Sequence, residues 1–467
     1  MITDKKTPYR LVNDEQFNRL MVRERELFAD RTARSRALFQ QAQTRLLNGV
    51  PMPWMGDWGT THPLFVKEAS GNRLVDVDNN EYLDFCLGDT GAMFGHSPEA
   101  TARAVEIQVR RGITTMMPSE DSLWIGEELH RRFGLPVWQV AMTATEANRY
   151  VIRICRTLTG RAKVLCMNEC YHGSLDETLP HLGPDGQLEL RSGYDMNPGL
   201  AKDLLTRVVE FNDVEALERE LAYGDVACVL AEPVMTNCGM VLPAAGYLAE
   251  LERLCRHYGV YLIIDETHTF SNGPGGYTAA NGLRPDFITI GKAIAGGIPV
   301  AAYGFSSEVV DRINDSFGRK GVSDPMGVGG TLSANAFAVA AMRATLEKVA
   351  TPQAFDRMFA GQNRLSEGLE AMLVKFRIPW SVTRSGARCE LQFMPHLPKN
   401  GTEAKAHFDW QLMYYTHQYL TNRGLLITPF HNMMLVAPMA TDEDIDRLIG
   451  AWTDCLAEMV ELAGWVG

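Results

Sequence analysis

The sequence lacks any apolar run long enough to cross a membrane, and its first residues contain no apolar signal core. The nine cysteines are scattered along the chain. They form no CxxC pair, and no Cys/His pairs stand at the spacing of a zinc finger. We therefore expect reduced thiols packed as small core residues, no metal site, no membrane partner and a cytoplasmic location.

Positive charge is also in short supply. The chain has 45 Lys and Arg against 57 Asp and Glu, for a net charge of −12. This balance argues against nucleic acid as a partner, although a local basic pocket for a phosphate remains compatible with it. Apolar residues make up 46% and charged residues 22% of the 467 positions, which is typical of a large globular protein with more than one structural unit.

The hydrophobic pattern divides the chain into three expected domains. Residues 1–94 contain amphipathic helices and a β-hairpin, and form an N-terminal segment that contributes to a small domain. In residues 95–340, helices alternate with short apolar strands, which predicts a mostly parallel sheet with ligands at the carboxyl ends of its strands. Residues 341–467 predict a smaller α+β unit whose last helix begins at Thr441, with Asp444 completing a capping box. The strand candidates of the middle region are WQVAMT, AKVLCMN, VACVLAEP, VYLIIDET and DFITIG.

One lysine stands at the end of an expected strand with little bulk around it. In DFITIGKAIAGG, Lys292 follows Gly291 and precedes Gly296–Gly297. A partly desolvated lysine gives up its proton more easily, its amine can then condense with a carbonyl, and the glycines leave room for a flat cofactor. In VYLIIDET, Asp265 ends another strand, where a carboxylate needs a cation or a donor such as a protonated ring nitrogen. Taken singly, each residue is better explained as an ordinary one, Lys292 as a surface lysine and Asp265 as a capping aspartate.

Two further signals occupy strand ends. In AMTATEAN a strand stops at Thr143 and a helix begins, and a helix N-terminus suits a phosphate, although capping by Thr143 or Thr145 explains the same residues. In ECYHG, Tyr171 could stack on a flat ring or simply pack. In this order, with Lys292 and Asp265, these residues predict a pyridoxal phosphate enzyme, in which the aspartate keeps the ring nitrogen protonated and the lysine holds the aldehyde and shuttles a proton.

Seven ordered motifs carry a resemblance that covers nearly the whole chain: YLDF…GHSPEA, TATEAN, YHG, AEP, IIDE, IGKAIAGG and GGTLSAN. The chain resembles the class III pyridoxal phosphate aminotransferases of fold type I, and within them the glutamate-1-semialdehyde aminomutase-like branch, which also holds β-amino-acid and D-phenylglycine aminotransferases. The resemblance implies an α/β fold: a large domain with a mostly parallel seven-stranded sheet, and a smaller α+β domain built from the N-terminal segment and the C-terminal part. It also implies a homodimer with shared sites.

The resemblance assigns roles around the cofactor ring. It implies that Lys292 holds the aldehyde, that Asp265 binds the ring nitrogen, and that Tyr171 stacks on the ring. Glu232 matches a glutamate that supports the site beside this aspartate. Thr267 stands where the family usually has valine under the ring, and its hydroxyl either contacts a cofactor oxygen or merely replaces a methyl group, of which we favour packing.

The phosphate of the cofactor is assigned in the same way. Ala144 and Thr145 match the phosphate-binding turn of the family, and Thr331 matches a threonine lent to the phosphate of the neighbouring subunit. The family prefers glycine where this chain has Ala144. The alanine keeps its backbone donor without strain only if its φ angle is negative.

The expected substrate contacts depart from the branch that the chain resembles. Glutamate-1-semialdehyde aminomutases carry an arginine in a GGVNSPVR segment that binds the substrate carboxylate, and here NGVPMPWM places Met55 at that position. Trp54 and Trp58 with Met55 suggest an apolar wall for a hydrophobic group, or pack the N-terminal segment on the dimer. Arg388 is a candidate partner for a substrate carboxylate.

These observations predict an aminotransferase that moves an amino group from an amine or amino acid with an apolar or aromatic group to a keto acid acceptor. The alternative is an aminomutase or racemase that uses the same Lys292. A catalytically silent cofactor-binding protein is a third possibility, and the presence of both Lys292 and Asp265 argues against it.

Overall fold

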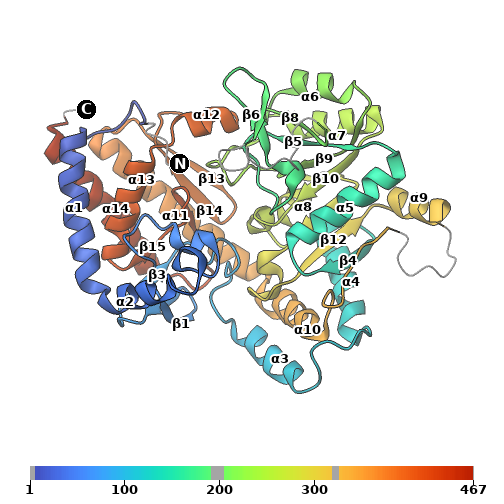
Figure 1. Cartoon of the computed structure of the whole chain (residues 1–467), viewed down its shortest axis with the longest axis horizontal. Helices are drawn as coiled ribbons and strands as arrows, with labels where there is room; N and C mark the ends of the chain where they lie inside the picture. Colours follow the sequence, from blue (N-terminus) through green and yellow to red (C-terminus); the bar gives the residue numbers. More distant parts are fainter. Residues whose placement is uncertain (1–5, 191–203, 318–325, 466–467) are drawn as a thin grey trace. The chain divides into compact units, whose positions relative to one another are not determined.

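The computed structural model describes residues 6–190, 204–317 and 326–465. The chain forms two compact units (Figure 1). The terminal unit consists of Met1–Ser97, Asp356–Leu397 and Ala404–Gly467, and the central unit consists of Pro98–Phe355 and Pro398–Glu403. The terminal unit therefore combines the N-terminal segment with the C-terminal part, as expected for this fold, while the three-domain division stays a prediction.

The central unit is built on a seven-stranded sheet in the order β4-β12-β11-β10-β9-β5-β8. Its strands are β4 Val137–Ala141, β5 Lys163–Met167, β8 Thr206–Val209, β9 Val226–Ala231, β10 Tyr261–Asp265, β11 Phe287–Ile290 and β12 Ala301–Phe305. Only β12 runs against its neighbours, so the mostly parallel seven-stranded sheet is confirmed. All five strand candidates form strands, as predicted. The sequence analysis did not predict β8 or β12, and the Ala and Gly residues of β12 have a low strand propensity.

Helices cover the strands of this sheet. Every residue of β9 and β10 is buried, which is why these strands read as unbroken apolar runs rather than alternating ones. Helix α5, Ala144–Thr159, packs along the sheet against β9 to β12 (Figure 1). The other helices of the unit are α3 Glu99–Val109, α4 Glu120–Phe133, α6 Val214–Leu221, α7 Tyr247–Tyr258, α8 Gly276–Asn281, α9 Ser307–Phe317 and α10 Ala336–Ala344, and β6 Pro180–Leu182 pairs with β7 Leu188–Leu190.

The terminal unit holds two small sheets and most of the long helices. One sheet joins β1 Val66–Ser70, β2 Arg73–Asp76, β3 Glu81–Asp84 and β15 Leu425–Leu426, and the other joins β13 Ser381–Ser385, β14 Arg388–Gln392 and β16 Met433–Leu435. The strands β2 and β3 are antiparallel, which confirms the predicted hairpin. The helices are α1 Asp14–Arg31, α2 Ala33–Ala42, α13 Trp410–Asn422 and α14 Asp442–Ala463. Two more helices, α11 Pro352–Phe376 and the short α12 Gly401–Ala406, begin in the central unit and end in the terminal unit.

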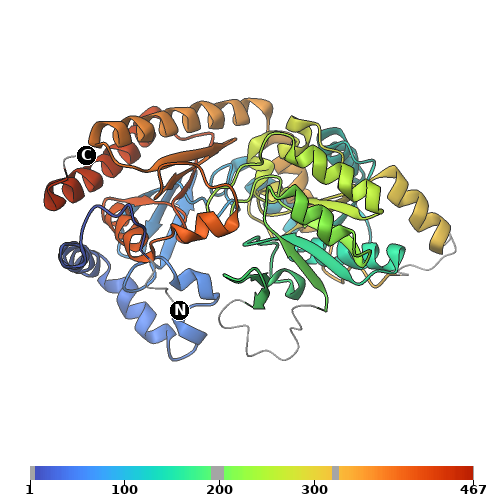
Figure 2. The same ribbon diagram turned by 90° about the horizontal axis from the view of Figure 1, so that it is seen from above.

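Local sequence signals explain how these helices begin and pack. The predicted capping box at the start of α14 is present: Thr441 accepts a hydrogen bond from the Asp444 backbone, and the Asp444 side chain bonds back. Helices α11 and α14 lie side by side (Figure 2), because Gly368 has no side chain that would collide with Ile449. An added Cβ at Gly368 would lie 2.4 Å from the Ile449 side chain.

The thiols behave as the composition predicts. All nine cysteines are buried and free of disulfide bonds, which confirms their expected role as small core residues. Within residues 6–190, 204–317 and 326–465, no helix combines the length and the apolar character that crossing a membrane requires.

Candidate active site

Asp265 and Lys292 lie at the carboxyl ends of two neighbouring parallel strands, and therefore at the same edge of the sheet. Asp265 is the last residue of β10 and lies opposite Thr289 of the parallel strand β11. Strand β11 ends at Ile290, and Lys292 begins the short 3₁₀ helix that follows. Lys292 has a φ of +50°, a left-handed conformation that costs a side chain of this kind about 1–3 kcal/mol. Such backbone strain is typical of functional positions.

Three donors surround the buried Asp265 carboxylate. Asn148 Nδ2 donates to Oδ2 at 2.9 Å, His172 Nδ1 lies 3.0 Å from the same oxygen, and the Thr267 backbone N–H donates to Oδ1 at 3.0 Å. Asn148 is held in turn by Thr289, whose hydroxyl donates to Asn148 Oδ1 at 2.6 Å. Asn148 closes the TATEAN motif, but the sequence alone did not indicate that it reaches Asp265.

Electrostatics keep this aspartate ionised. Burial alone would raise the pKa of Asp265, but the hydrogen bond and the charge of His172, with the other donors, lower it to about 2. Burial would likewise lower the pKa of His172, but the neighbouring Cys170 sulfur and the Asp265 carboxylate raise it to about 10. The strand end therefore pairs a buried carboxylate with a histidine whose pKa is raised above its ordinary value.

Glu232 adds a second buried acid to this edge. It follows β9, is 3% exposed and accepts hydrogen bonds from both the backbone N–H and the hydroxyl of Thr236. Burial raises its pKa, while the charge of His172 lowers it and that of Asp265 raises it, so the three groups interact electrostatically. The structure thus brings Glu232 to the region where the resemblance implied a supporting glutamate.

A histidine contacts the lysine directly. His268 lies in the turn that follows β10, is 6% exposed, and its Nε2 is 2.7 Å from Lys292 Nζ. The sequence analysis did not single out this histidine as a site residue. Its position three residues after Asp265 was the available signal, because that turn starts from the same edge of the sheet.

Helix α5 presents its N-terminus beside the lysine loop. Its N-cap, Thr143, accepts a hydrogen bond from the Glu146 backbone at 3.2 Å, which confirms the capping interpretation for this residue. Ala144 is the first helical residue and is not among the positions with positive φ, so alanine is unstrained where the family prefers glycine. A Cβ added to Gly291 would lie 3.2 Å from the Ala144 Cβ, so glycine permits this close approach.

The turn after β5 lies against the same helix end. Thr145 Oγ1 accepts a hydrogen bond from the Ser174 backbone at 3.2 Å. Gly173 has a φ of +86°, and a Cβ there would lie 2.0 Å from Thr145 Oγ1, so only glycine fits. Tyr171 is half-buried in this turn, and its stacking role stays a prediction.

The other predicted residues lie elsewhere. Thr331 is exposed in the central unit, where it lines a cavity of about 420 Å³. Trp54, Met55 and Arg388 belong to the terminal unit, so the structure leaves their substrate roles as predictions. Trp54 and Met55 are 41% and 47% exposed, whereas Arg388 is buried and donates a hydrogen bond to the Thr90 hydroxyl.

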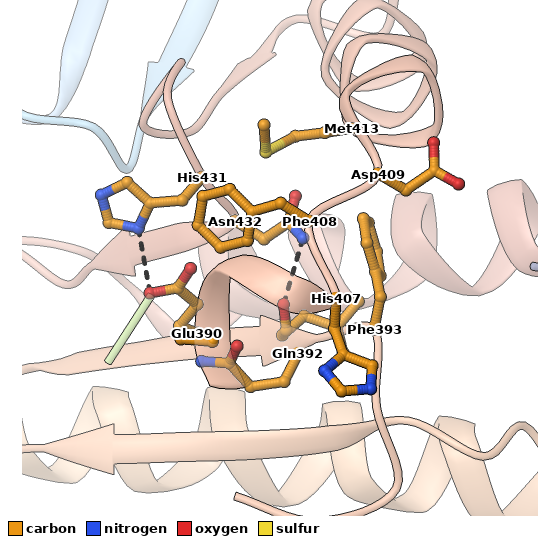
Figure 3. Close-up of a pocket in the computed structure, with 11 residues that line it drawn as sticks. Glu390, Gln392, Phe393, His407, Phe408, Asp409, Met413, His431 and Asn432 are labelled. Carbon is orange, nitrogen blue, oxygen red and sulfur yellow. Dashed lines mark hydrogen bonds and ion pairs between the residues drawn. The ribbon is translucent and has the colours of Figure 1, made fainter. Parts of the chain in front are cut away.

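The terminal unit holds a second cluster of buried polar groups. Figure 3 shows His431 facing Glu390, with 2.9 Å between Nδ1 and Oε2. Asn432 lies beside them, and its Oδ1 is 3.2 Å from Nε2 of His417. Burial lowers the pKa of His417 to about 3, so this histidine is neutral. The adjoining cavity of about 10 Å³ has room for roughly one water molecule, and none of its lining residues is a lysine.

The lysine edge of the central sheet fits pyridoxal phosphate in three respects. Asp265 supplies the buried anion that a protonated ring nitrogen requires. The Thr267 hydroxyl is buried and has no hydrogen-bond partner among the described residues, so a polar ligand atom would satisfy it. The N-terminus of α5, which begins at Ala144, favours an anionic group such as a phosphate.

Known proteins match the chain along most of its length. The model of the class III aminotransferases matches residues 55–456. Glutamate-1-semialdehyde 2,1-aminomutase of Anaeromyxobacter sp. strain Fw109-5 is 30% identical over 441 residues, which are 92% of this chain and 100% of that protein. An omega-transaminase from Sphaerobacter thermophilus is 27% identical, with a TM-score of 0.81 over 91% of this chain and 97% of the other.

A more similar solved structure is a glutamate-1-semialdehyde-aminomutase from Pseudomonas aeruginosa PAO1. It is 47% identical, with a TM-score of 0.94 over 96% of this chain and 99% of that protein. A lysine-to-alanine variant from the same organism has been solved in complex with PMP. The family model, the relatives and the fold agree, and the chain belongs to the class III aminotransferase family of pyridoxal phosphate-dependent enzymes.

Proposed function

We propose that the protein is a pyridoxal phosphate-dependent aminomutase that moves an amino group between neighbouring carbons of a small amino aldehyde. The observation that carries this proposal is the 47% identity over 96% of the chain to a protein described as a glutamate-1-semialdehyde-aminomutase. Glutamate-1-semialdehyde is accordingly the first substrate to test. The product would be an isomeric amino ketone, because the nitrogen moves to the aldehyde carbon and the carbonyl moves to its neighbour.

In this proposal Lys292 and Asp265 carry the chemistry. Pyridoxal phosphate, when bound, supplies an aldehyde that condenses with amines and a ring that withdraws electrons. Asp265 stays ionised and would hold a proton on the ring nitrogen, which strengthens that withdrawal. Lys292 Nζ would hold the aldehyde, give way to the amine of the substrate, and then carry the proton from one substrate carbon to the next acceptor atom.

Other residues would orient the cofactor. The N-terminus of α5, with Ala144 and Thr145, would bind the phosphate through backbone N–H groups and the threonine hydroxyl. Tyr171 would stack on the ring, and Glu232 would support the Asp265 network. The Thr267 hydroxyl, which is buried without a partner among the described residues, would accept or donate one hydrogen bond to the cofactor.

The test separates isomerisation from transfer. The purified protein would be incubated with pyridoxal phosphate and glutamate-1-semialdehyde, with no keto acid and no other amine. We expect the amino ketone to form over many turnovers, and Lys292→Ala to abolish it. If product instead requires stoichiometric keto acid, the aminomutase proposal fails and the transaminase alternative takes its place.

A specific observation favours that alternative. Met55 stands where the resembling branch carries its carboxylate-binding arginine, and both Met55 and Trp54 are exposed apolar side chains. Trp54 lies edge-on to Phe430, with ring centroids 5.4 Å apart. An apolar surface of this kind suits a donor with an apolar or aromatic group, transferred to a keto acid. Met55→Arg would then lower turnover of an aromatic amine, and Arg388→Ala would test the predicted carboxylate contact.

We further propose a homodimer with shared sites. Thr331, Met116 and Met117 are exposed around the 420 Å³ cavity of the central unit, and Leu332 beside them is 55% exposed. Exposed apolar clusters of this kind are typical of protein interfaces. Mixing Lys292→Ala with Thr331→Ala subunits tests the sharing, because a hybrid restores one intact site only if Thr331 serves the neighbouring subunit. A hybrid no more active than the parent variants would contradict it.

A further inference from the structure

The contact between Lys292 and His268 constrains their protons. At 2.7 Å, the line between Lys292 Nζ and His268 Nε2 accommodates one proton, because two N–H groups or two lone pairs facing each other repel. Two positive charges at this distance also repel strongly where water is scarce, and His268 is 6% exposed. The contact therefore favours a single proton on the line between the two nitrogens.

The turn that carries His268 is firmly held. The His268 carbonyl accepts a hydrogen bond from the Ser271 hydroxyl at 3.0 Å, and the Phe270 backbone donates to the Glu266 carbonyl at 2.8 Å. Strand β10 fixes the start of this turn, and β11 fixes the start of the lysine loop. The imidazole is consequently positioned by the backbone of the central unit.

The other charged groups at this edge are engaged with partners of their own. Asp265 accepts hydrogen bonds from Asn148, His172 and Thr267. The carboxylate of Glu266 accepts from Thr269 and from the backbone of Thr278. Glu232 accepts from Thr236.

We propose that His268 is a catalytic residue that accepts the proton of Lys292. The N–H bond of the Lys292 ammonium breaks, its electron pair stays on Nζ, and a new N–H bond forms at His268 Nε2, so the total charge is unchanged. The neutral amine then has the lone pair that attack on an aldehyde carbon requires. When the amine is displaced by substrate, the same contact returns the proton. This inference rests on the proposed role of Lys292 as the cofactor-binding amine.

Loading of the cofactor-free protein tests the inference without measuring turnover. Pyridoxal phosphate would be added, samples would be reduced with borohydride over time, and modified Lys292 would be quantified by peptide mass spectrometry. We expect His268→Gln to load about 100-fold more slowly at pH 7, the lower range for loss of a general base. His257→Gln, on the last turn of α7, is the matched control and should load like the wild type.

Chemical rescue separates proton transfer from packing. His268→Ala should load slowly, and imidazole in the buffer should accelerate it, whereas pyrazole, of similar shape but far weaker basicity, should not. Equal loading by His268→Gln and the wild type would overturn the proposal. So would equal rescue by imidazole and pyrazole, which would show that the ring only fills space.

A second measurement covers variants of His268 that fail to fold. In cofactor-free Lys292→Met protein with labelled histidines, NMR should show that the His268 imidazole binds its proton about tenfold more tightly than in the wild type, because a competing cation is gone. An unchanged titration would overturn the proposal. The loading and NMR experiments follow the proton between Lys292 and His268 and do not measure turnover. The role proposed for His268 is therefore independent of whether the keto acid test shows an aminomutase or a transaminase.

Discussion

His172 in the central unit and His417 in the terminal unit are both buried, yet their pKa values are shifted in opposite directions. The Asp265 carboxylate and the nearby Cys170 sulfur raise the pKa of His172 to about 10 in spite of burial. Nε2 of His417 faces the amide of Asn432, and burial lowers its pKa to about 3. Burial alone removes charge, and the ionised partner of His172 preserves it. In the central cluster, formed by Asp265, His172 and Asn148, the partner carboxylate therefore keeps the pKa of the histidine high where burial alone would lower it.

The largest expected effect comes from removing the anion of the central cluster. Asp265→Asn keeps the shape of the side chain but loses the charge, and we expect kcat/KM to fall by about 1,000-fold, because the proposed partner of the ring nitrogen is lost. Glu390→Gln is the matched change in the terminal unit and should leave kcat/KM of the folded protein within about twofold. Steady-state kinetics at equal cofactor occupancy checks both, and similar losses in the two variants would contradict the comparison.

The pH dependence of stability should have opposite signs for the two histidines. The pKa of His172 is raised to about 10, so its contribution is complete below pH 6.5 and is lost as pH rises toward 10. The pKa of His417 is lowered to about 3, so its contribution is complete above pH 6.5 and is lost as pH falls toward 3. Each loss should proceed at about 1.4 kcal/mol per pH unit.

Denaturant unfolding of cofactor-free protein measures these slopes. The stability difference between wild type and His172→Gln should shrink from pH 6.5 to pH 9, and the difference for His417→Gln should shrink from pH 6.5 to pH 5. If both differences shrink in the same direction, one of the two charge assignments is wrong.

A smaller effect is expected from crowding the turn in which Gly173 lies against Thr145, where we propose that the phosphate binds. Gly173→Ala adds a Cβ that would lie 2.0 Å from Thr145 Oγ1, in a backbone with a φ of +86°. We expect about a 10-fold loss of cofactor affinity and a destabilisation of about 1–3 kcal/mol. Gly160→Ala, at the other end of α5, has a φ of +68° and no atom within 4 Å, so it isolates the backbone cost. Equal cofactor affinity in the two variants would contradict a role for the crowded turn.

The smallest effect should come from Thr267→Val, which removes a buried hydroxyl without a partner among the described residues. The cofactor-free protein should become more stable by about 1 kcal/mol, since an unsatisfied polar group is lost. Cofactor affinity decides between the two interpretations of this hydroxyl: a several-fold loss indicates a contact with the cofactor, and no change indicates packing. Fluorescence titration with pyridoxal phosphate measures it.

Much of this architecture could be predicted from local sequence. The capping box of Thr441 and Asp444 and the five apolar strand candidates depend on neighbours in the chain, and all are present. The site could be predicted as far as strand ends, because parallel strands bring Asp265 and Lys292 to one edge. The contact of His268 with Lys292 and that of Asn148 with Asp265 could not, because they depend on turn geometry and on a helix 117 positions away along the chain.

The reversed strand β12 has a consequence for how the site tolerates change. Only residues 291–300 separate β11 from β12, too few for a crossover helix, so the chain must turn back and run antiparallel. Lys292 thus lies in a short segment that is continuous with a strand of the sheet at each end. Adding one residue to this segment would move the amine away from His268 without changing either strand, so the length of the segment, and not only the identity of residue 292, determines where the amine lies.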